Sequence, residues 1–305
     1  MSDELGRLID CARAWRAEGH ALKLATVIRT WGSAPRRIGA HLLVRDDGLF
    51  EGSVSGGCVE GAVIAEAVAL KSGGKRLDFG VADAKAWEVG LACGGEISIF
   101  VQAVDESGFP FALLQRLAEA RTLGAAVTLA TDFATGQTRE GSQGDFVHRY
   151  DPPLRMMLIG AVHISQALVP LALGLGITPL VVDPRGAFAA GPRFAGIEVD
   201  NRWPDEALEG WKPDSASAVV ALTHDPKLDD VALAAALKSD AFYIAALGSR
   251  KSHAARLERL AASGFDAAAL ARIRGPAGLD IGAANPAEIA LSVAAQMIEA
   301  WRKRP

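Results

Sequence analysis

The residue best suited to chemistry in this 305-residue chain is Cys58, in the run Gly52 to Gly61 that reads GSVSGGCVEG. Glycines let a backbone turn its N–H groups into one concavity, which is a cradle for an anion. The following segment, Val59 to Leu70, has the pattern of an amphipathic helix. Cys58 is therefore expected near a helix N-terminus, where the dipole favours thiolate over thiol. The run predicts a reactive or metal-ligating cysteine beside an anion site, and a packed cysteine in a tight turn is the alternative. The expected cradle residues are Ser53, Ser55, Gly56 and Gly57.

A second cysteine, Cys93, stands before the diglycine Gly94-Gly95 and just ahead of an expected strand, Ile97 to Val104. Two cysteines beside Gly-Gly at strand–loop junctions suggest facing loops that bring two soft ligands together. The chain has three cysteines, which excludes a four-cysteine zinc site, and no His lies at zinc-ligand spacing from Cys58 or Cys93. Cys11 lies beside the apolar stripe of an expected first helix, and we interpret it as packing.

Two arginines, Arg36 and Arg37, lie on a loop that glycine and proline punctuate, Trp31 to Gly39. The guanidinium fork of Arg matches phosphate with two hydrogen bonds, so this loop is a candidate anion clamp. A solvated loop without a ligand is the alternative.

Composition excludes several classes of protein. The net charge is −4 and no basic stripe is present, which argues against nucleic acid and anionic membrane surfaces as partners. The N-terminus is polar and acidic, unlike a signal peptide, and no apolar run reaches the length of a membrane span. An odd number of cysteines in a chain of this length argues against a disulfide framework and favours a cytoplasmic location.

The first half predicts an α/β domain with a mixed sheet. Its first helix starts at Leu5 and ends at Gly19, and an Asp46-Asp47-Gly48 turn joins two strands as a hairpin. The segment Thr135 to Pro153 is rich in Gly, Asp, Gln and Thr and is the best candidate for a boundary. We therefore expect one domain over 1–150 and a second over 151–305. The expected strands are Leu22–Thr30, Ala40–Arg45, Leu49–Ser53, Arg76–Phe79, Ile97–Val104, Ala125–Thr131 and Phe146–His148.

In the second half, apolar strands alternate with helices, which predicts a Rossmann-like, doubly wound parallel sheet. The expected strands begin at Arg155, Thr178, Ser217 and Ala241. The residues that follow them must all lie at the carboxyl edge of the sheet, where such folds bind ligands. These residues are Gly160, Asp183, His224 and Gly248.

The dinucleotide fingerprint G-x-G-x-x-G is incomplete at the first of these turns. Gly160 matches, but Val162 and Ser165 stand where the second and third glycines belong. Asp183 lies at a suitable distance to bind a ribose hydroxyl, yet Val162 places a branched side chain where pyrophosphate would approach. We therefore do not expect NAD(P) to bind. His163 and His224 are candidates for acid–base groups or metal ligands, and hydrogen-bonded structural histidines are the alternative.

Taken together, these motifs resemble the XdhC/CoxI family, the accessory factors of xanthine dehydrogenase and related molybdenum hydroxylases. The likeness covers nearly the whole chain, although the family usually has Gly where this chain has Val162. In the first half it rests on Gly32-Ser33-Ala34-Pro35-Arg36, Gly39, the run Gly52 to Glu60, and Cys93-Gly94-Gly95. In the second half it rests on Gly160-Ala161-Val162-His163, Val182-Asp183-Pro184-Arg185, Leu247-Gly248-Ser249-Arg250, Gly278 to Gly282, and Pro286 to Ala290.

The resemblance implies a cytoplasmic chaperone that binds molybdenum cofactor transiently, supports its sulfuration and passes it to an apo-hydroxylase. A cysteine desulfurase would be a second partner, and a homodimer is the expected assembly. Cys58 is the first candidate for sulfur carrier or molybdenum ligand, with Cys93 as its partner, and Glu60 is expected to cap or tune rather than catalyse. The expected cofactor contacts are Arg36, Arg37, Ser53, Ser55, Gly56, Gly57, Cys58, Gly94, Gly160, His163, Asp183, Gly248, Ser249 and Arg250. A nucleotide-dependent oxidoreductase acting through the Rossmann half, and an adaptor without a ligand, are the competing functions.

Overall fold

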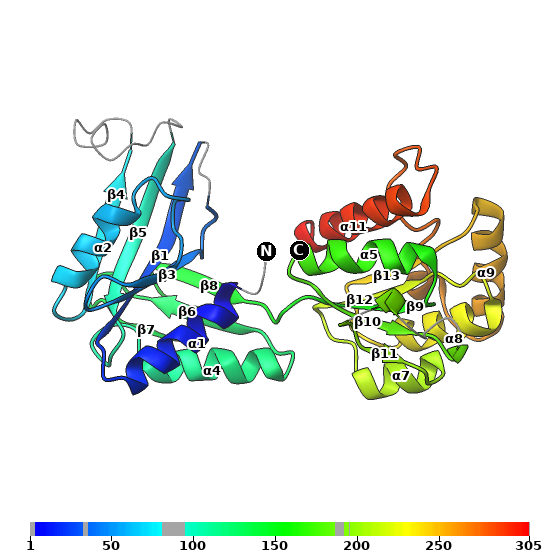
Figure 1. The fold of residues 1–305 in the computed structure, drawn as a ribbon, viewed down its shortest axis with the longest axis horizontal. Coiled ribbons are helices and arrows are strands. Elements are labelled where there is room, and N and C mark those ends of the chain that lie inside the picture. The colour runs from blue at the N-terminus through cyan, green and yellow to red at the C-terminus, as the bar shows by residue number, and fades with distance from the viewer. Residues whose placement is uncertain (1–3, 33–35, 81–94, 187–191, 195, 305) are drawn as a thin grey trace. The chain divides into compact units, whose positions relative to one another are not determined.

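The computed structural model describes the chain except for residues 1–3, 33–35, 81–94, 187–191, 195 and 305. The described residues form two compact units that divide between Pro152 and Pro153 (Figure 1). Each unit is described by itself below. In the described part of the chain, no helix combines the length and the apolar character that crossing a membrane requires.

The N-terminal unit contains two antiparallel sheets. The larger sheet has the order β3-β2-β1-β5-β4, and the smaller has the order β7-β6-β8. Every strand pair in the described part of this unit is antiparallel, so the mixed sheet that we expected here is wrong in that detail. The strands are β1 (Leu22–Trp31), β2 (His41–Arg45), β3 (Phe50–Gly52), β4 (Gly74–Phe79), β5 (Glu96–Ala103), β6 (Val127–Thr131), β7 (Thr138–Glu140) and β8 (Phe146–Tyr150).

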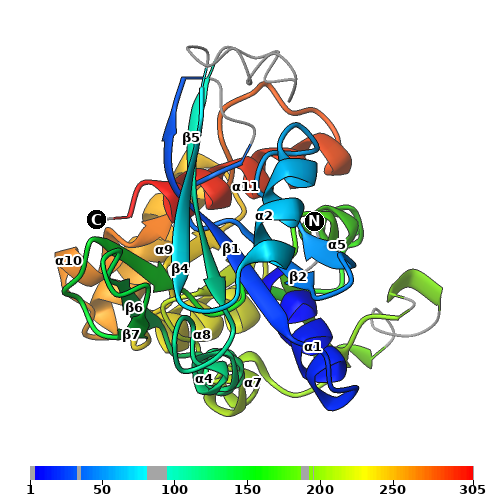
Figure 2. The same cartoon turned by 90° about the vertical axis from the view of Figure 1, so that its left-hand side faces the viewer.

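Helices pack on both faces of the larger sheet. Along β1, Leu22 and Leu24 join a core with α1 (Glu4–Ala17) and α4 (Phe111–Thr122). Ala25 and Val27 join a second core with α2 (Glu60–Ala69), which lies beside β1 and β5 in Figure 2. Burial on both faces accounts for the largely apolar sequence of β1. Each fully buried aliphatic side chain of this kind contributes roughly 1.5–3 kcal/mol.

The segment in which we expected the domain boundary is largely structured. Strands β7 and β8 both lie within Thr135 to Pro153 and pair with β6. In β8 the half-buried side chains of Phe146, His148 and Tyr150 alternate with exposed Val147 and Arg149, because one face of this small sheet is open to solvent. Only the last residues, Asp151 to Pro153, connect the two units.

The C-terminal unit is a parallel sheet with the strand order β11-β10-β9-β12-β13-β14. The order reverses between β9 and β12, which is the arrangement of a Rossmann fold. The expected fold class is therefore confirmed. The strands are β9 (Arg155–Ile159), β10 (Thr178–Val182), β11 (Val199–Asp200), β12 (Ser217–Ala221), β13 (Tyr243–Ala246) and β14 (Ile273–Arg274).

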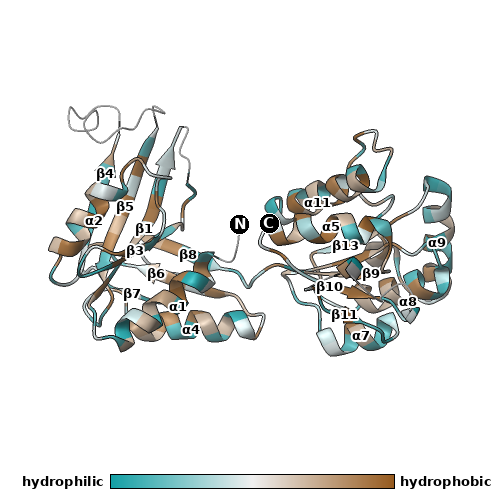
Figure 3. Ribbon diagram, viewed as in Figure 1, coloured by the Kyte–Doolittle hydropathy of each residue, from teal (hydrophilic) through white to brown (hydrophobic). Residues whose placement is uncertain are grey.

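Alternate side chains of β9 pack on opposite faces of this sheet. Met156 and Leu158 pack with α5 (His163–Gly174) and α11 (Pro286–Arg302). Met157 and Ile159 face the opposite core, to which α7 (Pro204–Trp211), α8 (Pro226–Leu237) and α9 (Arg250–Ala262) contribute. A short helix, α10 (Ala267–Leu270), follows α9. Figure 3 shows hydrophobic residues along these strands and more hydrophilic ones on α9.

Candidate functional site

Cys58 lies on the turn between β3 and α2. Its thiol is free and its side chain is half-buried against the core under α2. Val54 and Val59 are fully buried on either side of it and anchor the turn. The helix begins at Glu60, so Cys58 stands two residues before its first turn, close to where the sequence places it. Gly56 and Gly57 adopt positive φ values of 78° and 113°, which only glycine takes up readily.

The N–H groups of this turn converge on one carboxylate, that of Glu60. Its Oε1 accepts from the N–H groups of Ser55 at 2.8 Å, Gly56 at 3.1 Å and Val54 at 3.2 Å. Its Oε2 accepts from the N–H of Gly57 at 2.9 Å. Two hydroxyls complete the set: Ser53 donates to Oε1 at 2.7 Å, and Ser55 donates to Oε2. The concavity predicted from the glycines exists, and the protein's own anion occupies it.

Burial raises the pKa of Glu60, but the hydrogen bonds from Ser55 and Ser53 and from the backbone outweigh that effect and bring the pKa to about 2. The carboxylate is therefore ionised at neutral pH and meets the positive end of α2. The cofactor-binding role expected of Ser53, Ser55, Gly56 and Gly57 therefore stays a prediction. They hold Glu60, and an incoming phosphate would first have to displace it.

The two loop arginines differ in their surroundings. Arg36 donates from Nε to the carbonyl oxygen of Ser53 at 3.0 Å and from Nη2 to Glu4 at 2.6 Å, so it ties the turn to α1. Arg37 is exposed. Arg36 is thus engaged within the unit, and the anion clamp of two arginines stays a prediction.

Two expected site residues, Cys93 and Gly94, lie outside the described residues. The pairing of Cys58 with Cys93 consequently stays a prediction. The third cysteine, Cys11, is half-buried beside the core of α1, where burial followed by the charges of Glu51 and Asp10 raises the pKa of its thiol. Its surroundings match the packing role expected of it.

The sequence pattern missed a buried polar chain behind the turn. His41 bonds Thr26 through Nδ1 at 2.9 Å and the hydroxyl of Tyr150 through Nε2 at 3.0 Å, while its carbonyl accepts the N–H of Ser53 at 2.9 Å. Burial, then the nearby charges of His148 and Arg36, lower the pKa of His41 to about 3, so the imidazole is neutral. No local motif could have found this chain, because Tyr150 stands 109 residues from His41.

In the Rossmann unit, the ends of β9 and β12 approach closely at the strand-order reversal. Gly160 ends β9 with φ of 110°, and a Cβ there would lie 2.7 Å from Cγ2 of Thr223, which follows β12. Ser165 donates to the carbonyl of Gly160 at 2.5 Å. Gly160 is thus needed for a close approach of two strand ends.

Asp183 is fully buried and its oxygens are occupied. Oδ2 accepts from the N–H of Ala161 at 2.8 Å, and Arg185 donates to both oxygens from its side chain at 2.8 and 2.9 Å. Burial raises the pKa of Asp183, and the bonds from Arg185 and Ala161 lower it overall. A ribose hydroxyl would therefore have to compete with Arg185 and Ala161 for this carboxylate, and the role of ribose ligand considered for Asp183 stays a prediction.

The remaining expected residues lie at the same carboxyl edge. His163 starts α5 and His224 follows β12, and both are exposed. His224 has a positive φ of 62°, an uncommon conformation for this residue. No cluster of His, Cys, Asp and Glu that could hold a metal occurs in the described part of the chain. Gly248, Ser249 and Arg250 form the turn from β13 into α9.

Known proteins match this arrangement. Residues 156–297 match the family model described as the XdhC Rossmann domain, and residues 15–80 match the one described as the XdhC and CoxI family. The molybdenum cofactor insertion chaperone PaoD of Escherichia coli (strain K12) is 30% identical over 288 residues, which cover 92% of this chain and 83% of PaoD.

Two further relatives cover almost the full length. A probable xanthine dehydrogenase subunit of Bacillus subtilis (strain 168) is 27% identical over 320 residues, covering 92% of this chain and 93% of that protein. A solved structure from Bacillus halodurans, described as a xanthine dehydrogenase, has a TM-score of 0.76 at 25% identity and covers 100% of this chain and 97% of its own. A Cys58 turn on an antiparallel unit, a Rossmann unit and relatives that span both lead to one conclusion: the chain belongs to the XdhC and CoxI family.

Proposed function

We propose that this protein is a chaperone that binds molybdenum cofactor and supports its insertion into a xanthine dehydrogenase-type hydroxylase. The observation that carries the proposal is the likeness to PaoD, named a molybdenum cofactor insertion chaperone, over 92% of the chain. That likeness extends through both units. The name of the Bacillus subtilis relative supports a partner of the xanthine dehydrogenase type.

The described residues fit this cofactor in part. Molybdenum cofactor consists of a pterin with a phosphate and a molybdenum centre that would supply oxo and sulfido chemistry. A half-buried free thiol such as Cys58 suits contact with a soft metal. The phosphate does not fit the Ser53–Gly57 N–H groups, because Glu60 holds them. The cavity behind the turn, lined by Glu4, Leu5, Leu8, Gly39, Ala40 and His41, measures about 120 Å³ and is too small for a pterin. Cys58 is therefore the N-terminal contact that we retain, with exposed Arg37 on the neighbouring loop as a second candidate.

Several finer steps belong to the proposal. The cofactor would be held transiently, sulfuration would be supported with Cys58 as the sulfur-carrying thiol, and a cysteine desulfurase would supply the sulfur. A homodimer and a cytoplasmic location complete the expectation. Trapping a persulfide on Cys58 by mass spectrometry, after incubation with a desulfurase and cysteine, would test the sulfur-carrying step.

The main experiment measures pterin occupancy. Protein purified from a molybdenum-replete host should carry a pterin that oxidises to a fluorescent product, and Cys58→Ala should lose most of it. The matched control is Cys11→Ala, which removes another half-buried free cysteine and should retain the pterin. Full occupancy in Cys58→Ala would contradict the assignment. Equal loss in both variants would indicate damage to the fold instead.

A nucleotide-dependent oxidoreductase is not favoured by the geometry. Val162 stands where the fingerprint has its second glycine, and the oxygens of buried Asp183 accept from Arg185 and Ala161. Calorimetry with NAD(P)H should show no binding below roughly millimolar concentrations, a limit of about −4 kcal/mol. Micromolar binding would revive that function.

A further inference from the structure

Anion-binding turns in this molecule are mostly filled by its own carboxylates. Glu60 occupies the Ser53–Gly57 turn, and Asp183 takes the N–H of Ala161 beside Gly160. After β12, Asp229 accepts from the N–H groups of Thr223 at 3.2 Å and His224 at 3.1 Å. The Gly248 turn after β13 differs, because neutral hydroxyls cap it.

The Gly248 turn opens into α9, a helix of 13 residues. Ser249 caps the N-terminus of α9. The Oγ of Ser249 accepts the N–H of Ser252 at 3.1 Å, and the carbonyl of Ser249 accepts the N–H of His253 at 2.9 Å. Among the described residues, the N–H groups of Arg250 and Lys251 find no partner. The first turn of α9 thus presents two backbone donors and the positive end of the dipole to solvent.

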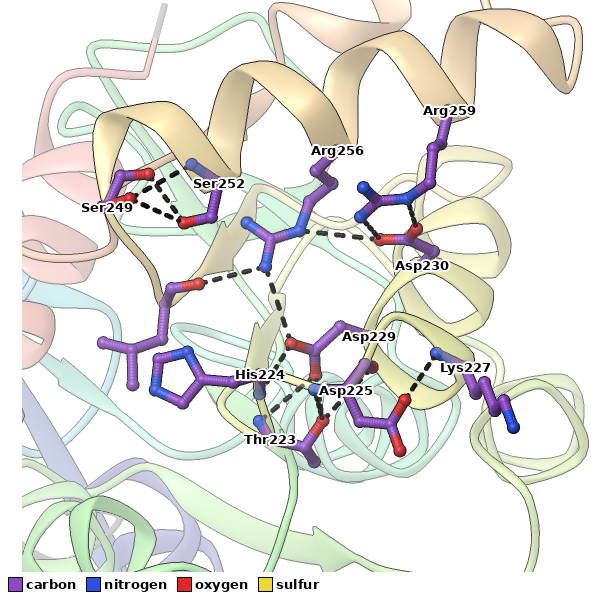
Figure 4. A network of polar contacts seen from close by, with 11 residues as sticks. Thr223, His224, Asp225, Lys227, Asp229, Asp230, Ser249, Ser252, Arg256 and Arg259 are labelled. Atoms are coloured by element: carbon purple, nitrogen blue, oxygen red, sulfur yellow. Dashed lines mark hydrogen bonds and ion pairs between the residues drawn. The ribbon is translucent and has the colours of Figure 1, made fainter.

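A buried arginine lies behind this turn. Arg256 is 5% exposed and donates from Nη2 to the carbonyl of Leu247 at 3.0 Å. Asp229 lies 3.6 Å from Nη2, and Asp230 lies 3.7 Å from Nε. In Figure 4 the guanidinium lies between Ser252 and Asp230. Within the described chain, Nη1 of Arg256 is buried without a hydrogen-bond partner. An unpaired charged donor is costly unless an acceptor approaches it.

The surroundings of Gly248 show where Nη1 of Arg256 points. Its φ is 142°, and a Cβ built there would lie 2.7 Å from Oγ of Ser252 and 3.9 Å from Nη1 of Arg256. The missing side chain therefore leaves the Ser252 hydroxyl and the Arg256 guanidinium bordering the same space. The unpaired Nη1 is directed toward the turn and away from Asp230.

We propose that the Gly248 turn binds the phosphate group of a phosphate-carrying ligand, with the N–H groups of Arg250 and Lys251 as direct donors. The Ser252 hydroxyl, which donates to the carbonyl of Ser249 at 2.9 Å in the free turn, would rotate to donate to the phosphate. Arg256 lies behind them as the cation that balances the phosphate charge. Helix N-termini and arginine are both suited to phosphate. The ligand is either the pterin cofactor, through its phosphate, or a nucleotide. This site does not depend on the role of Cys58.

The test follows binding of inorganic phosphate to the full chain through the amide chemical shifts of residues 248–252. The wild-type protein should show saturable shifts there. Ser252→Asp places a carboxylate at the site and should weaken phosphate binding by at least about tenfold. An acidic residue in the first turn favours the helix, so this variant should remain folded. Unchanged affinity in Ser252→Asp, or shifts confined to other residues, would overturn the proposal.

Arg256→Gln provides the second variant, and Arg259→Gln is its matched control. Arg259 stands on the same helix but pairs with Asp230 at 2.5 Å and is largely exposed. Loss of the buried charge in Arg256→Gln should weaken binding about tenfold, while Arg259→Gln should leave it within about twofold. Equal losses in the two variants would mean that only net charge matters and would overturn the assignment of Arg256. Should Arg256→Gln unfold, Ser252→Asp still decides the question.

Competition distinguishes the two sources of phosphate. Displacement of inorganic phosphate by ADP, sensitive to Ser252→Asp, would assign a nucleotide. The same displacement by isolated molybdopterin would assign the cofactor. If neither displaces it, the turn binds free phosphate only and the proposed ligand class is wrong. Pterin occupancy in Cys58→Ala is read separately, so failure of either proposal can be distinguished.

Discussion

The Ser53–Gly57 turn and the Gly160 turn both direct backbone N–H groups at a carboxylate, but they hold it by different means. Glu60 accepts six hydrogen bonds, and every donor is an N–H dipole or a hydroxyl. Asp183 accepts one N–H from the Gly160 turn, and Arg185 supplies the other donors. One turn therefore keeps a net negative charge, whereas the other contains a neutral pair.

This difference indicates which turn depends more on its carboxylate side chain to keep its shape. Removing Glu60 would leave the N–H groups of Val54, Ser55 and Gly57 without an acceptor, while that of Gly56 would keep the Ser53 hydroxyl at 2.9 Å. The turn that carries Cys58 would therefore lose its shape. Removing the charge of Asp183 would leave Arg185, whose side chain is 35% exposed and can turn toward water. We expect the Ser53–Gly57 turn to be the more sensitive of the two.

The largest effect is expected for Glu60→Ala, which should lower the free energy of unfolding of the N-terminal unit by about 3 kcal/mol, because buried donors lose their acceptor. Urea unfolding, together with hydrogen exchange of residues 53–60, measures it. Glu66→Ala is the control on the same helix: its exposed ion pair with Lys75, at 2.6 Å, should be worth less than about 1 kcal/mol. Equal losses would show that the converging bonds to Glu60 do not stabilise the turn.

A smaller loss, about 2 kcal/mol, is expected for Asp183→Asn, because an amide cannot satisfy Arg185 and Ala161 together. The readout is hydrogen exchange of β9 and β10 during urea unfolding. Asp200→Asn removes a comparable pair with Arg202, also two residues on, but there the arginine is 54% exposed, and the loss should stay below about 1 kcal/mol. A greater loss for Asp183→Asn than for Glu60→Ala would reverse the comparison.

The smallest effect is expected on the stability that Glu60 contributes when the pH is lowered. The unfolded chain, with a Glu pKa of 4.5, takes up a proton before folded Glu60, whose pKa is about 2. Stability from Glu60 is therefore complete above the unfolded pKa and is lost as pH falls through the folded one. The difference in unfolding free energy between wild type and Glu60→Gln should shrink between about pH 7 and about pH 3. A difference that does not vary with pH would mean that the charge of Glu60 contributes nothing.

The sequence pattern was sufficient to predict the sheet of the C-terminal unit, because strands buried on both faces are continuous apolar runs between helices. It also placed the Gly-rich turn ahead of α2. The helix α11 and the short strands β7, β11 and β14 were missed. Two-residue strands such as β11 carry too little pattern to identify, and β7 is polar where its face meets solvent.

The occupant of the Ser53–Gly57 turn could not be predicted in the same way. Glycines that shape a concavity look alike whether a ligand or a side chain fills it, and only the folded geometry shows that Glu60 reaches back over it. An acidic residue in the first helical turn was the available signal. Contacts between distant segments, such as His41 with Tyr150, leave no local pattern at all.

The six donors and the acceptor of the Cys58 turn all come from residues 53–60. The hydrogen bonds that shape the turn are therefore local to eight consecutive residues. Contacts with the rest of the unit, from Arg36 and the carbonyl of His41 to Ser53 and from the buried side chains of Val54 and Val59, hold the turn in its place. We expect sequence drift in this lineage to be tolerated around the turn sooner than within it.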